Sequence, residues 1–250
     1  MNFIRLVLSV LAFTLIGAIN NVNAAEIRVL SSNAMREVLL EAAPKFERLS
    51  GNKVSMNFIG SVDILSRLRS GDKNVDIIVL QVSSIEELIS EGIIAKNSRV
   101  DISRSLVGAA VRAGAPHPDI STRDALYKTL LATKSIVVSS GPSGAYMLGL
   151  FERMNIPGNQ YTQAKPGIQT GTLVARGEAD LCFQQVSELL PVKGIDFLGA
   201  LPSDVGHTTV FASGIQVNSP NQEPSRKFVQ YLTSPAALPI LKAKGMEPAN

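Results

Sequence analysis

Apolar and polar positions follow two alternating spacings along most of the chain. Short apolar runs and every-second-residue patterns, typical of strands, are separated by segments whose apolar residues recur every three or four positions, typical of helices. The strand pattern at 53–59, for example, follows a helical pattern that ends at Gly51. Repeats of one strand and one helix over about 25 residues predict parallel strand–helix units and therefore an α/β fold.

These two patterns predict a series of elements from residue 27 to residue 244. Strands are expected at 27–30, 53–59, 75–80, 106–111, 136–138, 181–184, 196–198 and 208–217. Helices are expected at 35–49, 61–68, 83–89, 121–131, 143–151, 173–176, 225–232 and 235–244. The series contains no low-complexity linker and no strong internal repeat.

The first 24 residues have the pattern of a secretory signal peptide. A basic start containing Arg5 precedes an apolar run at 6–18, and Val22 and Ala24 place small residues three and one positions before a cleavage point. The apolar run is short for a membrane anchor, which needs roughly 20 residues. No cysteine lies near the cleavage point, so a lipid anchor is not indicated. We therefore expect cleavage near Ala24 and export of the mature protein to the periplasm.

The composition excludes several kinds of chemistry. The 250 residues include one cysteine and two histidines, His117 and His207, so neither a disulfide framework nor a metal site built from these residues is expected. A net charge of +3 is too small for a nucleic-acid binder, in which Lys and Arg cluster. Cys182 lies within an apolar strand and is expected to be a small buried residue. We expect no cofactor, no metal and no nucleic-acid partner.

Four turns between a strand and the following helix carry small polar residues or glycine. They are Ser31-Ser32-Asn33, Gly60-Ser61, Ser143-Gly144 and Gln169-Thr170-Gly171. A helix start offers unpaired backbone N–H groups and the positive end of the helix dipole, so it binds anions without a charged side chain. In open α/β sheets such turns gather at the carboxyl ends of the strands. The alternative is that these residues only cap their helices, as Ser, Thr and Asn commonly do.

The order of these elements and several short motifs resemble the periplasmic molybdate-binding proteins and their relatives. The motifs are the turn 32–35, Ile59-Gly60-Ser61, Val75-Asp76-Ile77, the segment 174–181 and the aromatic helix 228–232. The resemblance covers nearly the whole mature chain. It implies a two-lobe, type II solute-binding fold in which serine hydroxyls and backbone N–H groups hold an oxyanion in a cleft between the lobes.

The resemblance also implies how the chain divides and which residues meet the ligand. The first lobe is expected to contain residues 25–105 together with 213–250, and the second lobe residues 106–212. The candidate ligand-binding residues are Ser32, Asn33, Ser61, Ser143, Gly144, Thr170 and Gln185. As in the family, a monomer that delivers its ligand to an ABC-type membrane permease is expected.

One position departs from the family pattern and bears on the ligand. Gln185 stands where molybdate binders carry a tyrosine that hydrogen-bonds the oxyanion. The amides of Gln184 and Gln185 accept as well as donate hydrogen bonds, whereas molybdate offers acceptors only. We therefore expect a small organic carboxylate rather than molybdate.

A second function class stays open at this point. The segments 100–104, 113–116 and 183–189 resemble the aconitate isomerase relatives of the molybdate-binding proteins. Interconversion of cis- and trans-aconitate is an allylic proton shift, which requires an acid and a base near the substrate. The titratable residues nearest to the four turns are Tyr146, Lys165, Glu188 and His207. None of them is singled out as catalytic by the sequence, which favours binding over an isomerase.

Overall fold

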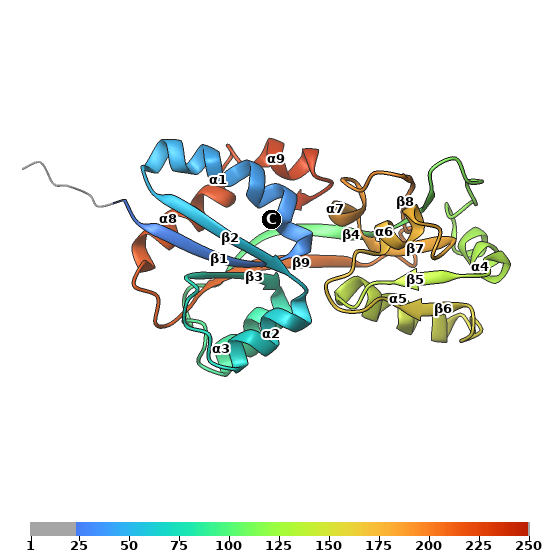
Figure 1. The fold of residues 1–250 in the computed structure, drawn as a ribbon, viewed down its shortest axis with the longest axis horizontal. Coiled ribbons are helices and arrows are strands. Elements are labelled where there is room, and N and C mark those ends of the chain that lie inside the picture. Colours follow the sequence, from blue (N-terminus) through green and yellow to red (C-terminus); the bar gives the residue numbers. More distant parts are fainter. Residues whose placement is uncertain (1–23, 250) are drawn as a thin grey trace, which may run out of the picture.

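The computed structural model describes residues 24–249 and arranges them as two α/β lobes lying side by side (Figure 1). Apart from Ala24, the expected signal peptide lies outside the described residues. Among residues 24–249, no helix combines the length and the apolar character that crossing a membrane requires.

The first lobe is built on a sheet whose strand order is β2-β1-β3-β9-β4. β1 pairs in parallel with β2 and β3, and Val29 of β1 lies between Met56 and Ile77. The parallel strand–helix units expected from the repeats are therefore confirmed for this part of the chain. The strands are β1 (Glu26–Ser32), β2 (Lys53–Ile59), β3 (Ile77–Gln81), β4 (Val100–Arg112) and β9 (Thr208–Ile215), with the short β10 (Glu247–Pro248) against β4.

Helices cover both faces of this sheet because successive strand residues point to opposite faces. Ile27 and Val29 of β1 pack in one apolar cluster with α1, α8 and α9, whereas Leu30 packs in another with α2 and α3. Figure 1 shows the same two layers. The helices of the first lobe are the short 3₁₀ helix η1 (Asn33–Met35), α1 (Arg36–Ser50), α2 (Ser61–Arg69), α3 (Val82–Ser90), α8 (Gln222–Leu232) and α9 (Leu238–Ala243).

The second lobe repeats this layered design around a smaller sheet. Alternate residues of its strands face two apolar clusters, one against α4 and α5 and the other against α6 and α7. The remaining strands are β5 (Ile136–Val138), β6 (Tyr161–Gln163), β7 (Leu181–Gln185) and β8 (Ile195–Ala200). The helices are α4 (Arg123–Ala132), α5 (Pro142–Arg153), α6 (Thr170–Ala175) and α7 (Val186–Leu189).

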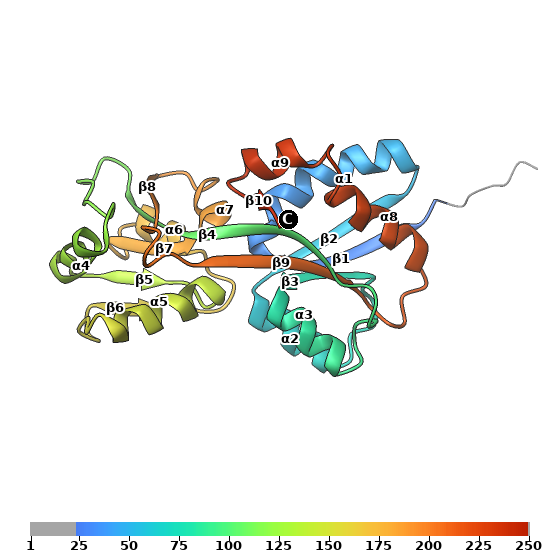
Figure 2. The same ribbon diagram turned by 180° about the vertical axis from the view of Figure 1, so that it is seen from behind.

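Two long antiparallel strands, β4 and β9, join the lobes, as Figure 2 shows from behind. β4 changes partner along its length: residues up to Leu106 pair with β9, and residues from Val107 pair with β7 and β8. The lobe limits expected from the sequence stay a prediction, and the strand pairing places the whole of β9 in the sheet of the first lobe.

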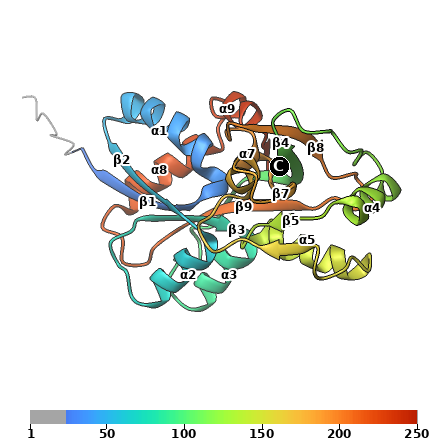
Figure 3. The same cartoon turned by 45° about the vertical axis from the view of Figure 1, so that its right-hand side comes forward.

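The lobes also touch beside the crossing strands. α7 of the second lobe packs against η1 of the first, and Figure 3 shows α7 beside the start of α1, which follows η1. The end of α7 meets the C-terminal segment so closely that a Cβ atom added at Gly245 would lie 2.6 Å from Leu190 Cδ1. The described arrangement is therefore one in which the two lobes are in contact.

Most expected elements are present, but the short helix α7 is not among the expected elements, α6 begins at Thr170 rather than at residue 173, and further differences concern β4, two short strands and α9. β4 begins at Val100, six residues before the expected start at Leu106. The earlier start was not expected because residues 100–105 mix apolar and polar side chains and do not form an apolar run. The two short strands β6 and β10 carry no strand pattern of their own. α9 begins at Leu238 rather than at residue 235, since residues 235–237 form a turn.

Candidate functional site

A small cavity of about 40 Å³ lies between the lobes, where the starts of η1, α2 and α5 meet the end of β7. Its first-lobe wall is formed by Ser32, Asn33, Ala34, Gly60, Ser61 and Phe211. Its second-lobe wall is formed by Ser139, Ser140, Gly141, Pro142, Ser143, Gly167, Ile168, Gln184, Gln185 and Glu188. Neither wall contains a lysine, an arginine or a histidine.

The first-lobe wall presents hydroxyl and N–H groups that the protein leaves unused. Ser32 ends β1 and is 3% exposed, and its Oγ has no hydrogen-bond partner among the described residues. Ser61 is the first residue of α2, so its backbone N–H has no acceptor within the helix. A buried hydroxyl without a partner is costly, which makes Ser32 a group prepared for a ligand.

The two walls lie close together at Gly60. A Cβ atom there would lie 3.0 Å from Asp63 Oδ2 and 3.1 Å from the backbone nitrogen of Gly167, which belongs to the second lobe. A larger residue would therefore push the loop around Gly167 away from α2. The glycine lets the second lobe close over the start of this helix.

The second-lobe wall begins with a serine-rich turn at the start of α5. Ser139 Oγ lies 2.9 Å from Ser143 Oγ and accepts a hydrogen bond of 3.1 Å from the Gly144 backbone N–H. Pro142 occupies the first turn of α5, where a missing N–H costs nothing. The turn is tightly folded, because a Cβ atom added at Gly144 would lie only 1.6 Å from the Ser139 carbonyl oxygen.

A chain of side-chain hydrogen bonds continues this wall. The Gln184 amide oxygen accepts from the Thr170 backbone N–H at 2.9 Å and from Thr170 Oγ1 at 2.8 Å. The Gln184 amide nitrogen donates to Glu188 Oε1 at 2.8 Å. Both ends of the Gln184 amide are thus committed to the protein, and this amide fixes the carboxyl of Glu188 beside the cavity.

Glu188 is the one ionisable side chain of the cavity lining. Burial raises its pKa to about 7, and the hydrogen bond from Gln184 offsets this only in part. The side chain is partly accessible because it faces the cavity, while the protein desolvates its carboxyl. A carboxyl with a pKa near 7 exchanges protons readily at neutral pH, as a general acid or base must.

The structure brings five of the seven predicted ligand residues to this cavity. These five are Ser32, Asn33, Ser61, Ser143 and Gln185. Gly144 and Thr170 stand behind the lining: the Gly144 N–H is bonded to Ser139, and the Thr170 hydroxyl is bonded to Gln184. The ligand role of all seven stays a prediction.

Gln185 has protein partners of its own at the crossing strands. Its amide oxygen lies 2.7 Å from Thr209 Oγ1, which donates to it, and its nitrogen lies 3.2 Å from the carbonyl oxygens of Ser105 and Leu106. These contacts join β7 to β4 and β9. The amide therefore connects the second lobe to the strands about which the lobes are linked.

Sequence reasoning missed Ser139 and Ser140 as lining residues, named Gln184 only as an amide beside Gln185, and did not distinguish Glu188 from three other titratable candidates. The repeated serines of 139–143 were a visible signal, since all precede the same helix start. The position of Glu188 left no such signal, because it depends on the packing of α7 against η1.

The other three titratable candidates lie away from the cavity lining. The rings of Tyr146 and His207 stack on each other with centroids 4.5 Å apart, and the Tyr146 hydroxyl donates to the Val205 carbonyl oxygen. Burial lowers the pKa of His207. Lys165 is exposed in a neighbouring groove.

That groove, of about 1070 Å³, adjoins the cavity and shares Asn33, Gly60, Gly167 and Ile168 with it. Its charged lining residues are Arg36, Glu37, Asp63, Lys165, Arg176, Glu178 and Lys193. Four of these seven are cations, so the approach to the cavity carries a small excess of positive charge. Such a surface favours the entry of anions.

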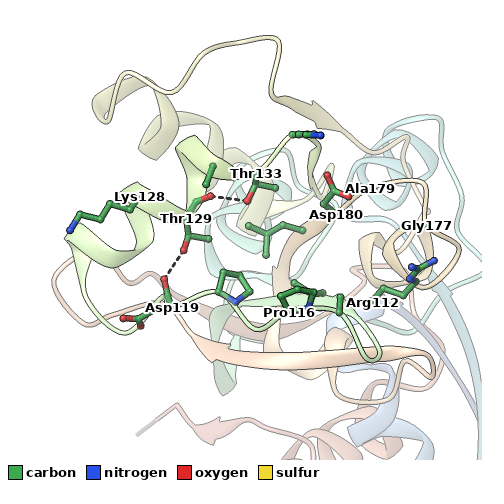
Figure 4. A pocket seen from close by; sticks show the side chains of 15 residues that line it. Arg112, Pro116, Asp119, Lys128, Thr129, Thr133, Gly177, Ala179 and Asp180 are labelled. Carbon is green, nitrogen blue, oxygen red and sulfur yellow. Dashed lines mark hydrogen bonds between the residues drawn. The ribbon is translucent and has the colours of Figure 1, made fainter.

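A larger hollow, of about 760 Å³, lies at the outer end of the second lobe (Figure 4). Its hydroxyls serve the fold: Thr129 Oγ1 donates to the Asp119 carbonyl oxygen at 2.7 Å, and Thr133 Oγ1 donates to that of Thr129 at 2.7 Å. It contains none of the predicted ligand residues. The interlobe cavity is therefore the better candidate site despite its smaller size.

Two further features bear on the chemistry of the described chain. Residues 24–249 contain no group of three or more His, Cys, Asp or Glu side chains arranged to hold a metal ion. Cys182 is buried in β7, and burial raises its thiol pKa to about 12. The expectation of a small buried cysteine is confirmed, and this thiol is a poor nucleophile because little thiolate forms at neutral pH.

Several known proteins are similar to this chain. An aconitate isomerase from Pseudomonas sp. is 36% identical over 228 residues, which cover 88% of this chain and 87% of the relative. The Azotobacter vinelandii periplasmic molybdate-binding protein superposes with a TM-score of 0.72 at 19% identity, over 88% of this chain and 98% of that structure. The sulfate-binding protein SubI from Mycobacterium tuberculosis superposes with a TM-score of 0.73 at 16% identity, over 90% and 88%.

These comparisons agree with the architecture. The two structures confirm the predicted two-lobe binding-protein fold with its cleft between the lobes. A family model described as bacterial extracellular solute-binding protein matches residues 27–247, nearly the whole described chain. The chain belongs to this family of bacterial extracellular solute-binding proteins.

Proposed function

We propose that the protein is a periplasmic binding protein that captures a small organic carboxylate in the cavity between its lobes. The observation that carries this proposal is the unpartnered, buried hydroxyl of Ser32 in a cavity bounded by helix starts from both lobes. Ser32, Asn33 and Ser61 hold the anion from one side, and Ser143 with the N–H groups at the start of α5 holds it from the other. Helix N-termini stabilise an anion without a cationic side chain.

Glu188 disfavours an anion that brings acceptor atoms only, as long as its own carboxyl is ionised. Beside Glu188, an oxyanion with acceptor atoms only meets a second acceptor at short range, which is repulsive. A hydrogen on the ligand, or on the carboxyl of Glu188 itself, turns this contact into a hydrogen bond. From the sequence, the amides of Gln184 and Gln185 were expected to favour a ligand that carries a hydrogen. Both amides bond to other protein groups, so Glu188 is the group that makes this requirement.

The family suggests how the captured ligand is used. The protein is exported through its N-terminal signal peptide, works as a monomer and passes the carboxylate to an ABC-type permease. β4 and β9 serve as the hinge about which the lobes open to release it.

Ligand carried through purification and identified by mass spectrometry tests the capture directly. Thermal shift with cis-aconitate, trans-aconitate, citrate, succinate, molybdate and sulfate tests it in parallel. We expect a carboxylate to raise the melting temperature, because a ligand that binds only the folded state stabilises it. Stabilisation by molybdate or sulfate at low concentration, with none by any carboxylate, would overturn the proposal.

An isomerase is the second candidate, favoured by Glu188 and by the 36% identical aconitate isomerase. In this reaction the Glu188 carboxylate removes a proton from the methylene carbon of trans-aconitate. The double bond moves by one position, and the proton is returned to the former vinyl carbon, giving the cis isomer after rotation. One base performs both transfers, and no atom is gained or lost overall.

Incubation of the purified protein with trans-aconitate, followed by NMR, separates the two candidates. Turnover predicts that the cis isomer appears, and deuterium from heavy water enters the allylic position only to the extent that the proton on Glu188 exchanges with solvent before it is returned. Glu188→Gln would abolish turnover and keep binding, whereas Glu152→Gln, at an exposed position of α5, would leave both unchanged. Saturable binding without turnover would reject the isomerase and retain capture.

A further inference from the structure

The cavity places an acidic side chain inside an anion site that has no cationic side chain in its lining. Gln184 already donates to Glu188 Oε1, so Glu188 Oε2 is the oxygen left for other partners. A second negative charge beside the bound anion would be unpaired in a desolvated space, which is strongly unfavourable. One of the two groups must therefore carry a proton.

We infer that the site takes up its carboxylate together with one proton, which is held between Glu188 Oε2 and the bound anion. Glu188 is then the residue that supplies this hydrogen, and its protonation decides whether an anion can bind beside it. This inference rests on the proposed capture and adds to it a proton that enters and leaves with the ligand.

The described elements packed against α7 offer no unpaired charge beside Glu188 that would replace this proton. Among the described residues packed against α7, η1 carries no ionisable side chain, and β7 carries only the thiol of Cys182. On β4 and β8, Arg104 is paired with Glu247, and Asp196 with His117. Asp101 is paired with Arg99, and Arg112 lies at the outer end of β4, in the lining of the outer hollow. At the C-terminal contact, Gly245 adds no charge.

The direction of the pH effect follows from the raised pKa of Glu188. Without ligand this pKa is about 7, and an anion bound beside the carboxyl raises the pKa further by like-charge repulsion. Above pH 7 the free protein loses the proton and the complex keeps it, so binding takes up a proton. Affinity then falls as the pH rises above 7, by a factor that approaches tenfold for each pH unit, until the pKa of the complex is reached.

Isothermal titration calorimetry with trans-aconitate, or with the panel carboxylate that stabilises the protein most, measures the proton directly. Titrations at pH 8 in two buffers of different ionisation enthalpy give the number of protons taken up for each ligand bound. We expect a value approaching one, and an affinity at pH 8 about fivefold weaker than at pH 7, because half of the free protein has already lost the proton at pH 7. The ligand carboxyls remain ionised throughout this range, so they do not add to the signal.

The variant Glu188→Gln tests whether Glu188 takes up the proton on binding or has only a structural role. The amide donates a hydrogen bond as the protonated acid does, but it does not ionise. We expect this variant to bind without proton uptake, with equal affinity at pH 7 and pH 8, and about tenfold more tightly than the wild type at pH 8. Glu152→Gln, which makes the same change at an exposed position, should keep the pH dependence of the wild type.

The possible results separate this inference from the proposed capture. Carboxylate binding with no proton uptake, or an unchanged pH dependence in Glu188→Gln, overturns the inference and leaves capture standing. Binding of no carboxylate in the panel overturns both. If the Glu188→Gln variant does not fold, the two-buffer titration of the wild type still tests the inference, because it counts the protons taken up without any variant.

Discussion

The two walls of the cavity meet the same space with different chemistry. The first-lobe wall offers a buried hydroxyl, Ser32, which has no partner within residues 24–249. The second-lobe wall is bonded within itself, through the Ser139–Ser143 pair and through the chain from Thr170 by way of Gln184 to Glu188. The Ser32 hydroxyl is open to a ligand, whereas these side chains of the second-lobe wall already bond one another.

This difference indicates a division of labour. An unsatisfied donor gains its hydrogen bond only when a ligand arrives, so it contributes affinity. A satisfied network gains no such bond, but it holds Glu188 in one position and sets the environment that fixes its protonation. Substitutions on the first-lobe wall should therefore change binding without changing stability, while those on the second-lobe wall should change both.

Gly144→Ala should have the largest effect, because it acts on the tightest turn of the second-lobe wall. The added methyl group would lie 1.6 Å from the Ser139 carbonyl oxygen, so residues 139–144 must move. We expect the free energy of unfolding to fall by about 3 kcal/mol, at the upper end of the usual cost of overpacking, and carboxylate binding to be lost. Urea denaturation and calorimetry measure the two quantities.

Gly149→Ala is the matched control on the same helix. Its added methyl group would meet only the end of the flexible Arg153 side chain, at 3.3 Å. Alanine is the better helix former by about 1 kcal/mol, so this variant should be at least as stable as the wild type and bind normally. Equal stability of the two variants would show that the serine turn is not the rigid part of the second-lobe wall.

Ser32→Ala tests the first-lobe wall and should have the next largest effect. The hydroxyl has no partner among the described residues, so its removal should leave the free energy of unfolding unchanged or slightly raised. The affinity for a carboxylate should fall by about tenfold, the equivalent of about 1.4 kcal/mol and of one lost hydrogen bond to an anion. Calorimetry gives the affinity, and thermal unfolding gives the stability.

Ser225→Ala separates ligand binding from the removal of any buried hydroxyl. Ser225 is also fully buried and unpartnered within the described chain, but it lies on α8, outside the cavity lining. Its replacement should reproduce the stability result without the loss of affinity. A normal affinity in Ser32→Ala would contradict the view of the first-lobe wall as the source of binding energy.

The residues of the first-lobe wall could be predicted from the sequence more readily than those of the second-lobe wall. Ser32 and Ser61 each follow a strand and precede a helix, and this local pattern places them at the same sheet edge. The two-lobe arrangement was implied by the resemblance to the molybdate-binding proteins, and the α/β class was predictable because strand and helix periodicities are local. The short β6 was not, since its three residues gain their strand conformation from pairing with β5.

The second-lobe wall depends on contacts between distant residues. Thr170 was expected to reach the ligand as a helix-start residue, but its hydroxyl bonds Gln184, fourteen positions further along the chain. Glu188 acquires its raised pKa only because the folded protein desolvates its carboxyl beside the cavity. No spacing in the sequence encodes that desolvation, because it arises from the meeting of two lobes.

Thr170→Val should have the smallest effect and decides whether Thr170 belongs to the network or to the ligand. Valine keeps the shape and removes the 2.8 Å bond to Gln184 Oε1, while the backbone N–H of residue 170 still donates to the same oxygen. We expect a loss of about 1 kcal/mol in the free energy of unfolding. Because Gln184 holds Glu188 less firmly, affinity should fall only about threefold, less than the tenfold loss expected for Ser32→Ala.

Thr172→Val on the same helix, which removes a bond to the Gln169 carbonyl oxygen, is the control and should not change affinity. A loss in Thr170→Val as large as in Ser32→Ala would instead place the Thr170 hydroxyl on the ligand, as its helix-start position alone suggested, and the contrast between the two walls would fail.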